Sequence, residues 1–409
     1  MTELDFAKKI HDLGGRAYLV GGAVRDKFRG VKAHDKDYCV TGLDEKIFAE
    51  NFPVAEKFGK SFPVYSVEID GKFCEVAFAR TERKIGAGYR GFEILFAPSV
   101  TIEQDLFRRD TTINAMAIEI LSGELIDPFG GRADVVDKKI RAVSKHFTDD
   151  PVRALRAARQ AAQFNFDICA DTVAAMKLCG EELAGEPTER IFDELETALA
   201  TDKPSIFFRS LERADLLEII FPEIFQLRGK IQPEIFHPEG DAYEHTLKIV
   251  DDVAAVNPKP IVRFAALMHD IGKSSTPPEI LPHHYQHEHR GLVVLNAMNR
   301  RMRLPNDWKK SAAFVIREHM RAPRLVKPGK IVRLLMSFNG LKISVDDFCD
   351  IIRADNHGLP AYLAHADEII AELLKVSGNA APPELAGKAV GQWIFDERVR
   401  RFVEFRRFD

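Results

Sequence analysis

The stretch AYLVGGAVRDKFRGVKAHDKDYCVTG, residues 17–42, decides how the first part of the chain folds. A short apolar strand leads into a glycine pair, a helix-like run follows, and residues 34–40 are predicted to form a second strand. Successive side chains on a strand alternate between faces, so Asp35 and Asp37 are expected to point the same way, about 7 Å apart. Two like charges held this close repel each other unless a cation lies between them.

The residue types around this acidic pair suit phosphoryl transfer. Mg²⁺ binds oxygen ligands, usually one or two carboxylates together with phosphate oxygens and water. Gly22 lets the backbone approach a ligand closely, and Arg25 carries a planar donor fork that fits phosphate. The combination predicts a two-metal site held by Asp35 and Asp37. For an Asp-x-Asp pair taken alone, the alternative to a metal site is an exposed strand edge whose carboxylates face only water.

The sequence GGAVRD followed by DxD resembles the head domain of the nucleotidyltransferases that add CCA to transfer RNA in bacteria and eukaryotes. Bacterial poly(A) polymerases are close relatives of that class. The resemblance implies that the two aspartates hold two Mg²⁺ ions. One ion would activate the 3′ hydroxyl of the RNA, and the other would neutralise the leaving pyrophosphate.

The rest of the head contains two further candidate features. Asp70-Gly71 is a strong hairpin signal between strand-like runs at 64–69 and 73–78. Glu75, on the second run, is a possible third metal-binding carboxylate, with an exposed strand residue as the alternative. Residues 80–92 are basic, glycine-rich and aromatic, which predicts a mobile loop that closes over a phosphate or a nucleobase.

The segment RRDTTINA begins at Arg108 and matches the family's RRDxTINA motif almost letter for letter. Adjacent arginines flanked by aspartates often form only surface ion pairs. The resemblance implies instead that Arg109 contacts the nucleotide triphosphate and that Asp110 shapes the pocket.

A predicted helix beginning near Asp149 carries Arg153, Arg156 and Arg159 on one face, because these residues are spaced by three. A carboxylate accepts hydrogen bonds from the exocyclic amines of cytosine and adenine, and an arginine donates to their acceptors. The family's EDxxR motif implies that Asp150 and Arg153 read the base. It also implies that the other two arginines bind the triphosphate. Asp149 stands where the family usually has Glu, and a capped helix with a solvated basic face is the alternative.

Nine of the thirteen histidines lie between residues 237 and 357. Imidazole and carboxylate together are common ligands of transition metals. The sequences EHT and HDIGK resemble the HD phosphohydrolase domain, whose pattern falls on His245, His269, Asp270 and Asp355. The resemblance implies a transition divalent ion such as Ni²⁺ and metal-dependent phosphatase and 2′,3′-cyclic phosphodiesterase activities. His283, His284, His287 and His289 are left unranked as further ligands, substrate contacts or exposed loop residues.

Composition narrows the class of protein further. A formal net charge of −4 over 409 residues excludes a generally basic nucleic-acid coat. The five cysteines include no CxxC spacing, which predicts reduced thiols. No signal-peptide core is found in residues 1–16, and no apolar run reaches the ~20 residues of a membrane span. We therefore expect a cytoplasmic protein that does not enter the membrane, as a monomer or homodimer.

The sequence as a whole predicts an α+β protein with a small mixed-sheet head followed by helical parts. Its expected domains are a nucleotidyltransferase head over 1–140, a neck and body over 141–235, an HD domain over 236–360 and a helical tail over 361–409. The resemblance implies a CCA-adding enzyme that uses CTP, ATP and tRNA. A poly(A) polymerase, an HD phosphohydrolase with an inactive head and a non-catalytic RNA-binding module are the alternatives, and addition of only C or only A stays open.

Overall fold

The computed structural model describes the chain except for residues 34, 59–61, 87–90, 234, 236–239, 356–357 and 406–409. Two compact units are formed. The first contains Met1–Glu194 and Ile206–Ile220, and the second contains Leu195–Ser205 and Phe221–Asp409.

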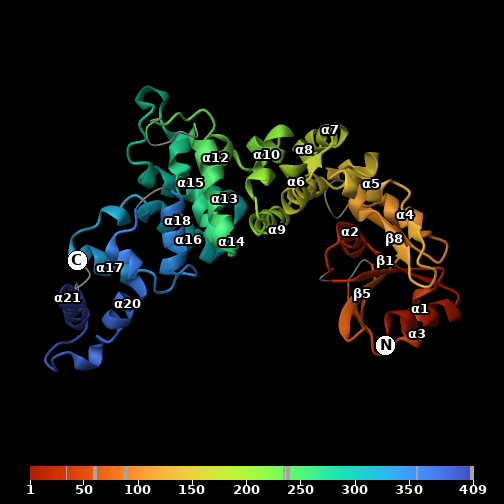
Figure 1. Cartoon of the computed structure of the whole chain (residues 1–409), viewed down its shortest axis with the longest axis horizontal. Coiled ribbons are helices and arrows are strands. Elements are labelled where there is room, and N and C mark those ends of the chain that lie inside the picture. The colour runs from red at the N-terminus through yellow and green to blue at the C-terminus, as the bar shows by residue number, and fades with distance from the viewer. Residues whose placement is uncertain are drawn as a thin grey trace. The chain divides into compact units, whose positions relative to one another are not determined.

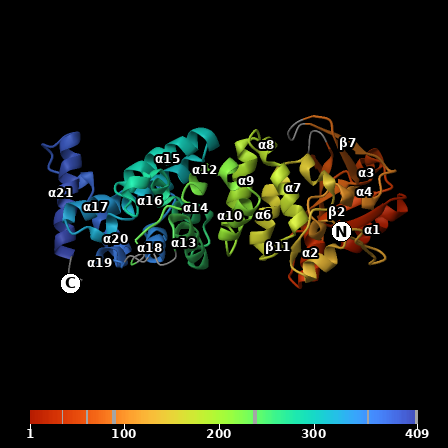
Figure 2. The ribbon, with the colours of Figure 1, turned by 90° about the horizontal axis from the view of Figure 1, so that it is seen from above.

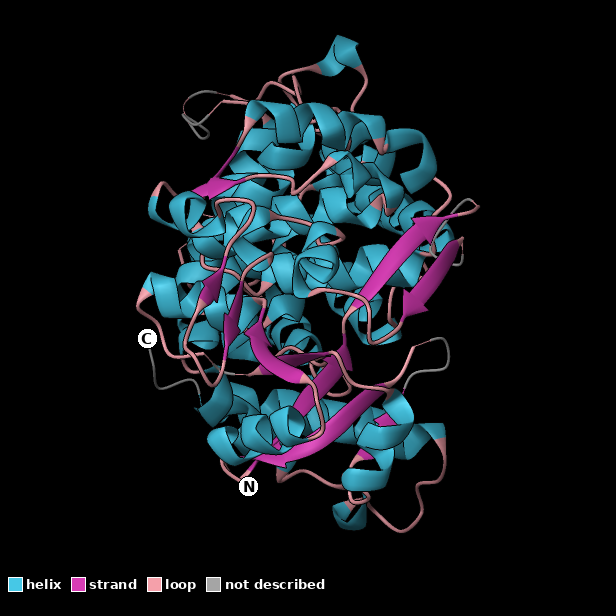
Figure 3. Cartoon of the chain, turned by 90° about the vertical axis from the view of Figure 1, so that its right-hand side faces the viewer, coloured by secondary structure: helices cyan, strands magenta, loops and turns pink. Residues whose placement is uncertain are grey.

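A seven-stranded mixed sheet organises the first unit (Figures 1 and 3). Its strands are ordered β3-β4-β5-β2-β1-β8-β9. β2 and β5 are parallel, and the other neighbours are antiparallel. The predicted mixed-sheet head is therefore confirmed. The strand bounds are β1 Arg16–Val20, β2 Asp37–Thr41, β3 Glu56–Phe58, β4 Val64–Ile69, β5 Lys72–Phe78, β8 Ala117–Glu119 and β9 Leu125–Ile126.

The two faces of the sheet are buried in two separate clusters. Phe6 of α1 (Glu3–Asp12) and Phe48 of α3 (Glu45–Asn51) pack with Tyr38 and Tyr65 on one face. Leu106 of α4 (Ile102–Phe107) belongs to a cluster that contains side chains of β1 and β2. The helices thus remove the apolar side chains of both strands from water, which is the main stabilising contribution.

Two details differ from the sequence prediction. β2 begins at Asp37, so the expectation that Asp35 lies on the strand is wrong, and residue 34 is outside the described residues. The segment predicted as a loop instead contains a hairpin of β6 (Arg80–Lys84) and β7 (Phe92–Phe96), with residues 87–90 not described. The Asp70-Gly71 turn is as predicted, because both residues have positive φ, 52° and 74°, between paired strands.

Helices and short strands complete the first unit. α6 places most of its apolar and small side chains inward, and it begins after Pro151, which fixes a helical φ. The remaining elements are α2 Gly22–Arg29, η1 Thr112–Asn114, α5 Gly131–Val136, β10 Lys139–Ile140, η2 Lys145–Asp149, α6 Val152–Phe164, β11 Asp167–Ile168, α7 Ala170–Leu178, α8 Gly180–Leu183, α9 Thr188–Leu199, α10 Ser205–Arg213 and α11 Leu217–Ile220, with α9 and α10 each crossing the unit boundary.

The described part of the second unit is helical. α14 packs against α13 and α16, and α15 packs against α16 and η3 (Figure 2). Among the described residues, no helix combines the length and apolarity that a membrane crossing requires. The elements are α12 Pro222–Phe225, α13 Ala242–Val256, α14 Pro260–Met268, η3 Ile271–Ser275, η4 Pro278–Ile280, α15 His287–Met302, α16 Asn306–Glu318, η5 Ala322–Arg324, α17 Pro328–Met336, α18 Val345–Ala354, α19 Ala361–Ala364, α20 Ala366–Leu374, η6 Gly378–Ala380 and α21 Lys388–Phe405.

Gly272 allows η3 and α15 to touch. A Cβ at this position would lie 1.9 Å from the His287 carbonyl oxygen and 2.5 Å from the Gly291 nitrogen, so backbone would have to move. We expect Gly272→Ala to lower the free energy of unfolding by about 1–3 kcal/mol, the usual cost of overpacking. Denaturant titration measures this change. Gly391→Ala is the matched control: its Cβ would meet nothing within 4 Å, and alanine favours the surrounding helix. Equal effects of the two changes would contradict the prediction.

Candidate functional sites

One cavity of about 1070 Å³ in the first unit gathers every head residue that the sequence proposed. It contains the three candidate carboxylates, the candidate phosphate-binding arginines and the two candidate base readers. The proposed residues lining it are Gly22, Arg25, Asp35, Asp37, Glu75, Arg109, Asp110, Asp150, Arg153, Arg156 and Arg159.

The carboxylates come from neighbouring strands. Asp37 is in register with Glu75 on the parallel strand β5, and Asp35 lies two residues before β2. Burial raises the pKa of Asp37, and the charges of Glu75 and Asp35 raise it further against the opposing effect of Arg109. Unfavourable ionisation of this kind is relieved by a bound cation. Among the described residues these carboxylates form no tight three-ligand group. Two carboxylates completed by triphosphate oxygens are nevertheless a usual Mg²⁺ environment.

The phosphate-binding candidates are held in place by neutral and acidic groups. Arg25 donates to Asn114 Oδ1 at 2.6 Å and lies over the Phe164 ring. Arg109 is paired with the buried Asp105 at 3.0 Å and donates to the Asn114 carbonyl. These contacts orient the guanidinium groups before any ligand binds, which reduces the entropy lost on binding.

Asp110 connects the head to the neck helix. Its carboxylate accepts hydrogen bonds from the Thr111 amide, Asn114, Gln160 and Arg156, the last at 2.9 Å. Burial raises its pKa, but the ion pair with Arg156 and the hydrogen bonds lower it more, so the net pKa is well below normal. The buried charge therefore fixes Arg156 over the cavity.

The two base-reading candidates are also positioned by neighbours. Asp150 accepts from Arg190 of α9 at 2.8 Å, and its other oxygen accepts from the Val152 amide. Arg153, only 8% exposed, donates to the His146 carbonyl at 2.7 Å and lies 3.7 Å from Glu82. The sequence singled out neither Glu82 nor Arg190 as a side chain facing this cavity.

A second cluster is buried in the second unit. His245, His269 and Asp270 form one group with ligand atoms within 4.8 Å of one another, and Asp270, His287 and His319 form another. The two groups share Asp270: its Oδ2 lies 3.2 Å from His269 Nε2, and its Oδ1 lies 3.1 Å from His287 Nε2. Asp355 joins the first group, 3.0 Å from His245 Nε2.

The hydrogen bonds of the imidazoles fit a metal centre. The Nδ1 atoms of His269, His287 and His319 face backbone carbonyls at 2.7 to 3.1 Å, so each Nδ1 carries the proton. Their Nε2 lone pairs then point inward, and those of His287 and His319 are 3.3 Å apart. Within the described part of the chain, Asp270 Oδ1 is buried without a hydrogen-bond partner. A cation between such facing acceptors would satisfy them together, and backbone-anchored histidines are typical metal ligands.

Comparison with known proteins assigns segments of the chain to domain families. Residues 17–141 match the Poly A polymerase head domain, 165–227 match the probable RNA and SrmB-binding site of polymerase A, and 242–335 match the HD domain. A multifunctional CCA protein of Nitrosococcus oceani is 45% identical over 325 residues, 78% of each chain. One from Vibrio vulnificus is 37% identical over 95% of this chain and 97% of its own.

The chain belongs to the multifunctional CCA protein family. The predicted order of a nucleotidyltransferase head followed by an HD domain is thereby confirmed. The fold agrees too: the Bacillus stearothermophilus CCA-adding enzyme in complex with CTP has a TM-score of 0.68 and 25% identity, covering 98% of this chain and 92% of that one.

The structure distinguishes the roles of the four histidines that the sequence left unranked, His283, His284, His287 and His289. His287 joins the buried cluster, whereas His289 is exposed on α15. His284 faces Thr276 Oγ1 and the Ile231 carbonyl, and burial lowers its pKa to about 4, so it is a neutral structural residue. His283 lines a cavity that also contains Asp270 and Asp355. Sequence reasoning missed His319, because a lone histidine late in a helix carries no motif.

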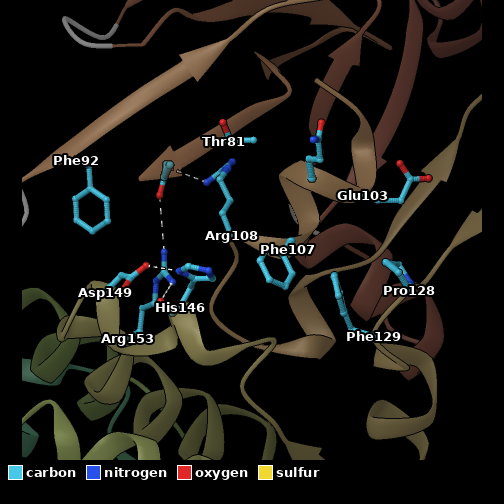
Figure 4. A pocket seen from close by; sticks show the side chains of 12 residues that line it. Thr81, Phe92, Glu103, Phe107, Arg108, Pro128, Phe129, His146, Asp149 and Arg153 are labelled. Atoms are coloured by element: carbon cyan, nitrogen blue, oxygen red, sulfur yellow. Dashed lines mark hydrogen bonds and ion pairs between the residues drawn. The ribbon is translucent and has the colours of Figure 1, made fainter. Parts of the chain in front are cut away.

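A mostly apolar cavity of about 480 Å³ adjoins the candidate site of the head (Figure 4). Glu82, Arg108 and Arg153 line both cavities. Figure 4 shows Phe107 beside His146, and their rings are 5.4 Å apart in an edge-to-face arrangement. Arg153, the candidate base-reading arginine, therefore lies between a polar cavity and an aromatic one.

Proposed function

We propose that the head adds CMP, CMP and AMP from CTP and ATP to the 3′ end of tRNA without a nucleic-acid template. The observation that supports this most directly is the single cavity that brings together Asp35 and Asp37, the arginines and the pair Asp150 and Arg153. A site that only bound RNA would not need carboxylates facing the position of a triphosphate.

In the proposed reaction the 3′ oxygen of the RNA bonds to the α-phosphorus of the nucleotide. The bond from that phosphorus to the bridging oxygen breaks, pyrophosphate leaves, and the hydroxyl proton passes to solvent. Two Mg²⁺ ions, when bound by Asp35 and Asp37 with Glu75 as a further carboxylate, supply a Lewis acid and neutralise the developing charge. Arg25, Arg109, Arg156 and Arg159 hold the triphosphate in line for attack.

Base selection follows from the two side chains that the neck positions. The ionised Asp150 accepts from the exocyclic amine of cytosine or adenine, and Arg153 donates to the adjacent ring acceptor. Guanine and uracil present the opposite pattern on that edge, so a hydrogen-bond mismatch would reject them. The contacts of Asp150 with Arg190 and of Arg153 with His146 fix both groups in space.

The test is incorporation of each labelled nucleotide separately into tRNA that lacks its CCA end. We expect CMP addition from CTP alone, and AMP addition from ATP to tRNA ending in CC. Extension of unrelated RNA by ATP only would favour a poly(A) polymerase, and incorporation by neither would overturn the proposal.

Asp150→Asn should relax base selection. The amide replaces one acceptor by a donor, which pairs with the carbonyl of uracil instead of the amine of cytosine. We expect kcat/KM for CTP to fall about tenfold to a hundredfold and the ratio of UTP to CTP use to rise, as expected for one lost charge-assisted hydrogen bond. Single-nucleotide addition kinetics measure both. Asp12→Asn is the control, because the Asp12 side chain is 81% exposed on the same unit. Equal losses for CTP and UTP in Asp150→Asn would contradict base reading.

For the second site we propose a two-metal phosphohydrolase. The donor set is His245, His269 and Asp355 on one side of Asp270 and His287 and His319 on the other. Imidazole and carboxylate suit a transition divalent ion such as Ni²⁺. Such ions, when bound, lower the pKa of water and polarise a phosphate ester. In hydrolysis the water oxygen bonds to phosphorus, the ester P–O bond breaks, and the leaving oxygen takes a proton.

We also propose that the protein acts in the cytoplasm. All five cysteines are free, as expected in the reducing cytoplasm. CTP, ATP and tRNA are the proposed partners, and the protein is proposed to act as a monomer or a homodimer.

A further inference from the structure

The mouth of the HD site carries two exposed aromatic side chains. A cavity of about 550 Å³ opens from Asp270 and Asp355 to His283 and Tyr285. The rings of His283 and Tyr285 are stacked, with centroids 5.4 Å apart and planes 25° from parallel. Tyr285 is 65% exposed, so an aromatic face is held in water at the entrance to a metal-binding cluster.

The loop that carries this pair is anchored on both sides. His284, which lies between the two residues in the sequence, makes hydrogen bonds with Thr276 and the Ile231 carbonyl. Arg290 donates to the Tyr285 carbonyl and to Thr276 Oγ1. These contacts fix the backbone of the aromatic pair, so little freedom is lost when a ligand stacks on it.

The cavity between the pair and the cluster suits a phosphate. The exposed Arg324 lines this cavity, whereas the Lys273 ammonium, which also lines it, is already paired with Asp270 Oδ2 at 2.5 Å. Arginine binds phosphate oxygens, and the volume falls within the range of small-molecule sites. Aromatic faces stack on nucleobases irrespective of sequence.

We propose that His283 and Tyr285 form a nucleobase platform, on which the base of a free nucleotide or of an RNA 3′ end stacks when its phosphate enters the HD site. This inference rests on the proposed phosphohydrolase. It adds that the base, and not only the phosphate ester, is recognised.

The first test compares two substrates of the metal-loaded enzyme that differ only in the base: adenosine 2′,3′-cyclic phosphate and methyl β-ribofuranoside 2′,3′-cyclic phosphate. We expect Tyr285→Ala to lower the ratio of their kcat/KM values about tenfold, as expected for loss of one base–aromatic stack, and Tyr285→Phe to restore it. An unchanged ratio would overturn the platform. If the wild type hydrolyses neither ester, the proposed phosphohydrolase fails, and the binding test below still decides on the platform.

The second test does not depend on hydrolysis. Tyr285→Trp places a fluorophore on the platform, and its emission should change on titration with adenosine 2′-monophosphate but not with ribose 5-phosphate. Equal responses to the two ligands, or none, would overturn the proposal. Titration with an RNA oligonucleotide ending in a 2′,3′-cyclic phosphate shows whether the base belongs to an RNA end or to a free nucleotide. Binding tighter than that of the mononucleotide identifies an RNA end, and weaker binding identifies a free nucleotide.

Discussion

Asp37→Ala and Asp35→Ala should each reduce CMP addition to tRNA about a thousandfold or more, while hydrolysis of a phosphate ester at the HD site continues. Both side chains line the head cavity, and Asp37 is held beside Glu75 by the parallel pairing of β2 and β5. Loss of one carboxylate removes electrostatic stabilisation at the reacting phosphate, and a single preorganised group of this kind is worth about 10²–10³ in rate. Loss of a metal ion as well makes the effect larger.

The measurement is incorporation of radiolabelled CMP into tRNA lacking its CCA end, with hydrolysis of adenosine 2′,3′-cyclic phosphate followed on the same preparation. Asp37→Asn separates charge from shape, because the amide has the same size without the negative charge. Asp12→Asn is the matched control, since the Asp12 side chain is 81% exposed on the same unit. Wild-type rates in Asp37→Ala would refute the metal-binding role, and parallel loss of hydrolysis would indicate unfolding instead.

The sequence predicted the head well where local patterns decide structure. The two strands on either side of Asp70-Gly71 follow from turn chemistry. The placement of three arginines on one face of α6 follows from helical spacing. It failed for Asp35, because the strand begins only where pairing with β1 and β5 begins, at Asp37. Strand ends are set by such partners, which no local pattern contains.

Contacts between distant segments explain the other omissions. Glu82 reaches Arg153 across 71 positions of the chain, and His319 faces His287 from another helix. Neither contact leaves a spacing signal. The sequence did not distinguish His284 from the neighbouring histidines. Its hydrogen bonds with Thr276 and Ile231 show that it holds its own loop in place.

Asp270→Asn should abolish tight binding of divalent metal at the HD site and reduce its hydrolytic activity to background. Asp270 is the one ligand that both three-residue groups share. Burial opposes its ionisation, but the neighbouring Lys273 ammonium outweighs burial and holds the pKa of Asp270 well below its usual value, so the carboxylate is charged. An amide has one acceptor oxygen and no charge, and it cannot bridge two cations. His319→Ala removes a ligand from one group only, and it should leave one tightly bound ion per chain instead of two.

Metal content after loading with Ni²⁺ and gel filtration measures the stoichiometry, with His289→Ala as the control because His289 is an exposed histidine of the same segment. Retention of two ions by Asp270→Asn would contradict the shared-ligand arrangement. A single ion in the wild type would contradict the two-metal site while leaving the hydrolase itself possible. Asp270→Asn also leaves the buried Lys273 ammonium without its ion-pair partner. This loss lowers the free energy of unfolding by up to about 3–5 kcal/mol. CMP addition by the head, measured on the same sample, therefore shows whether lost metal reflects lost ligation or a misfolded chain, and His319→Ala keeps the Asp270–Lys273 pair intact for the same comparison.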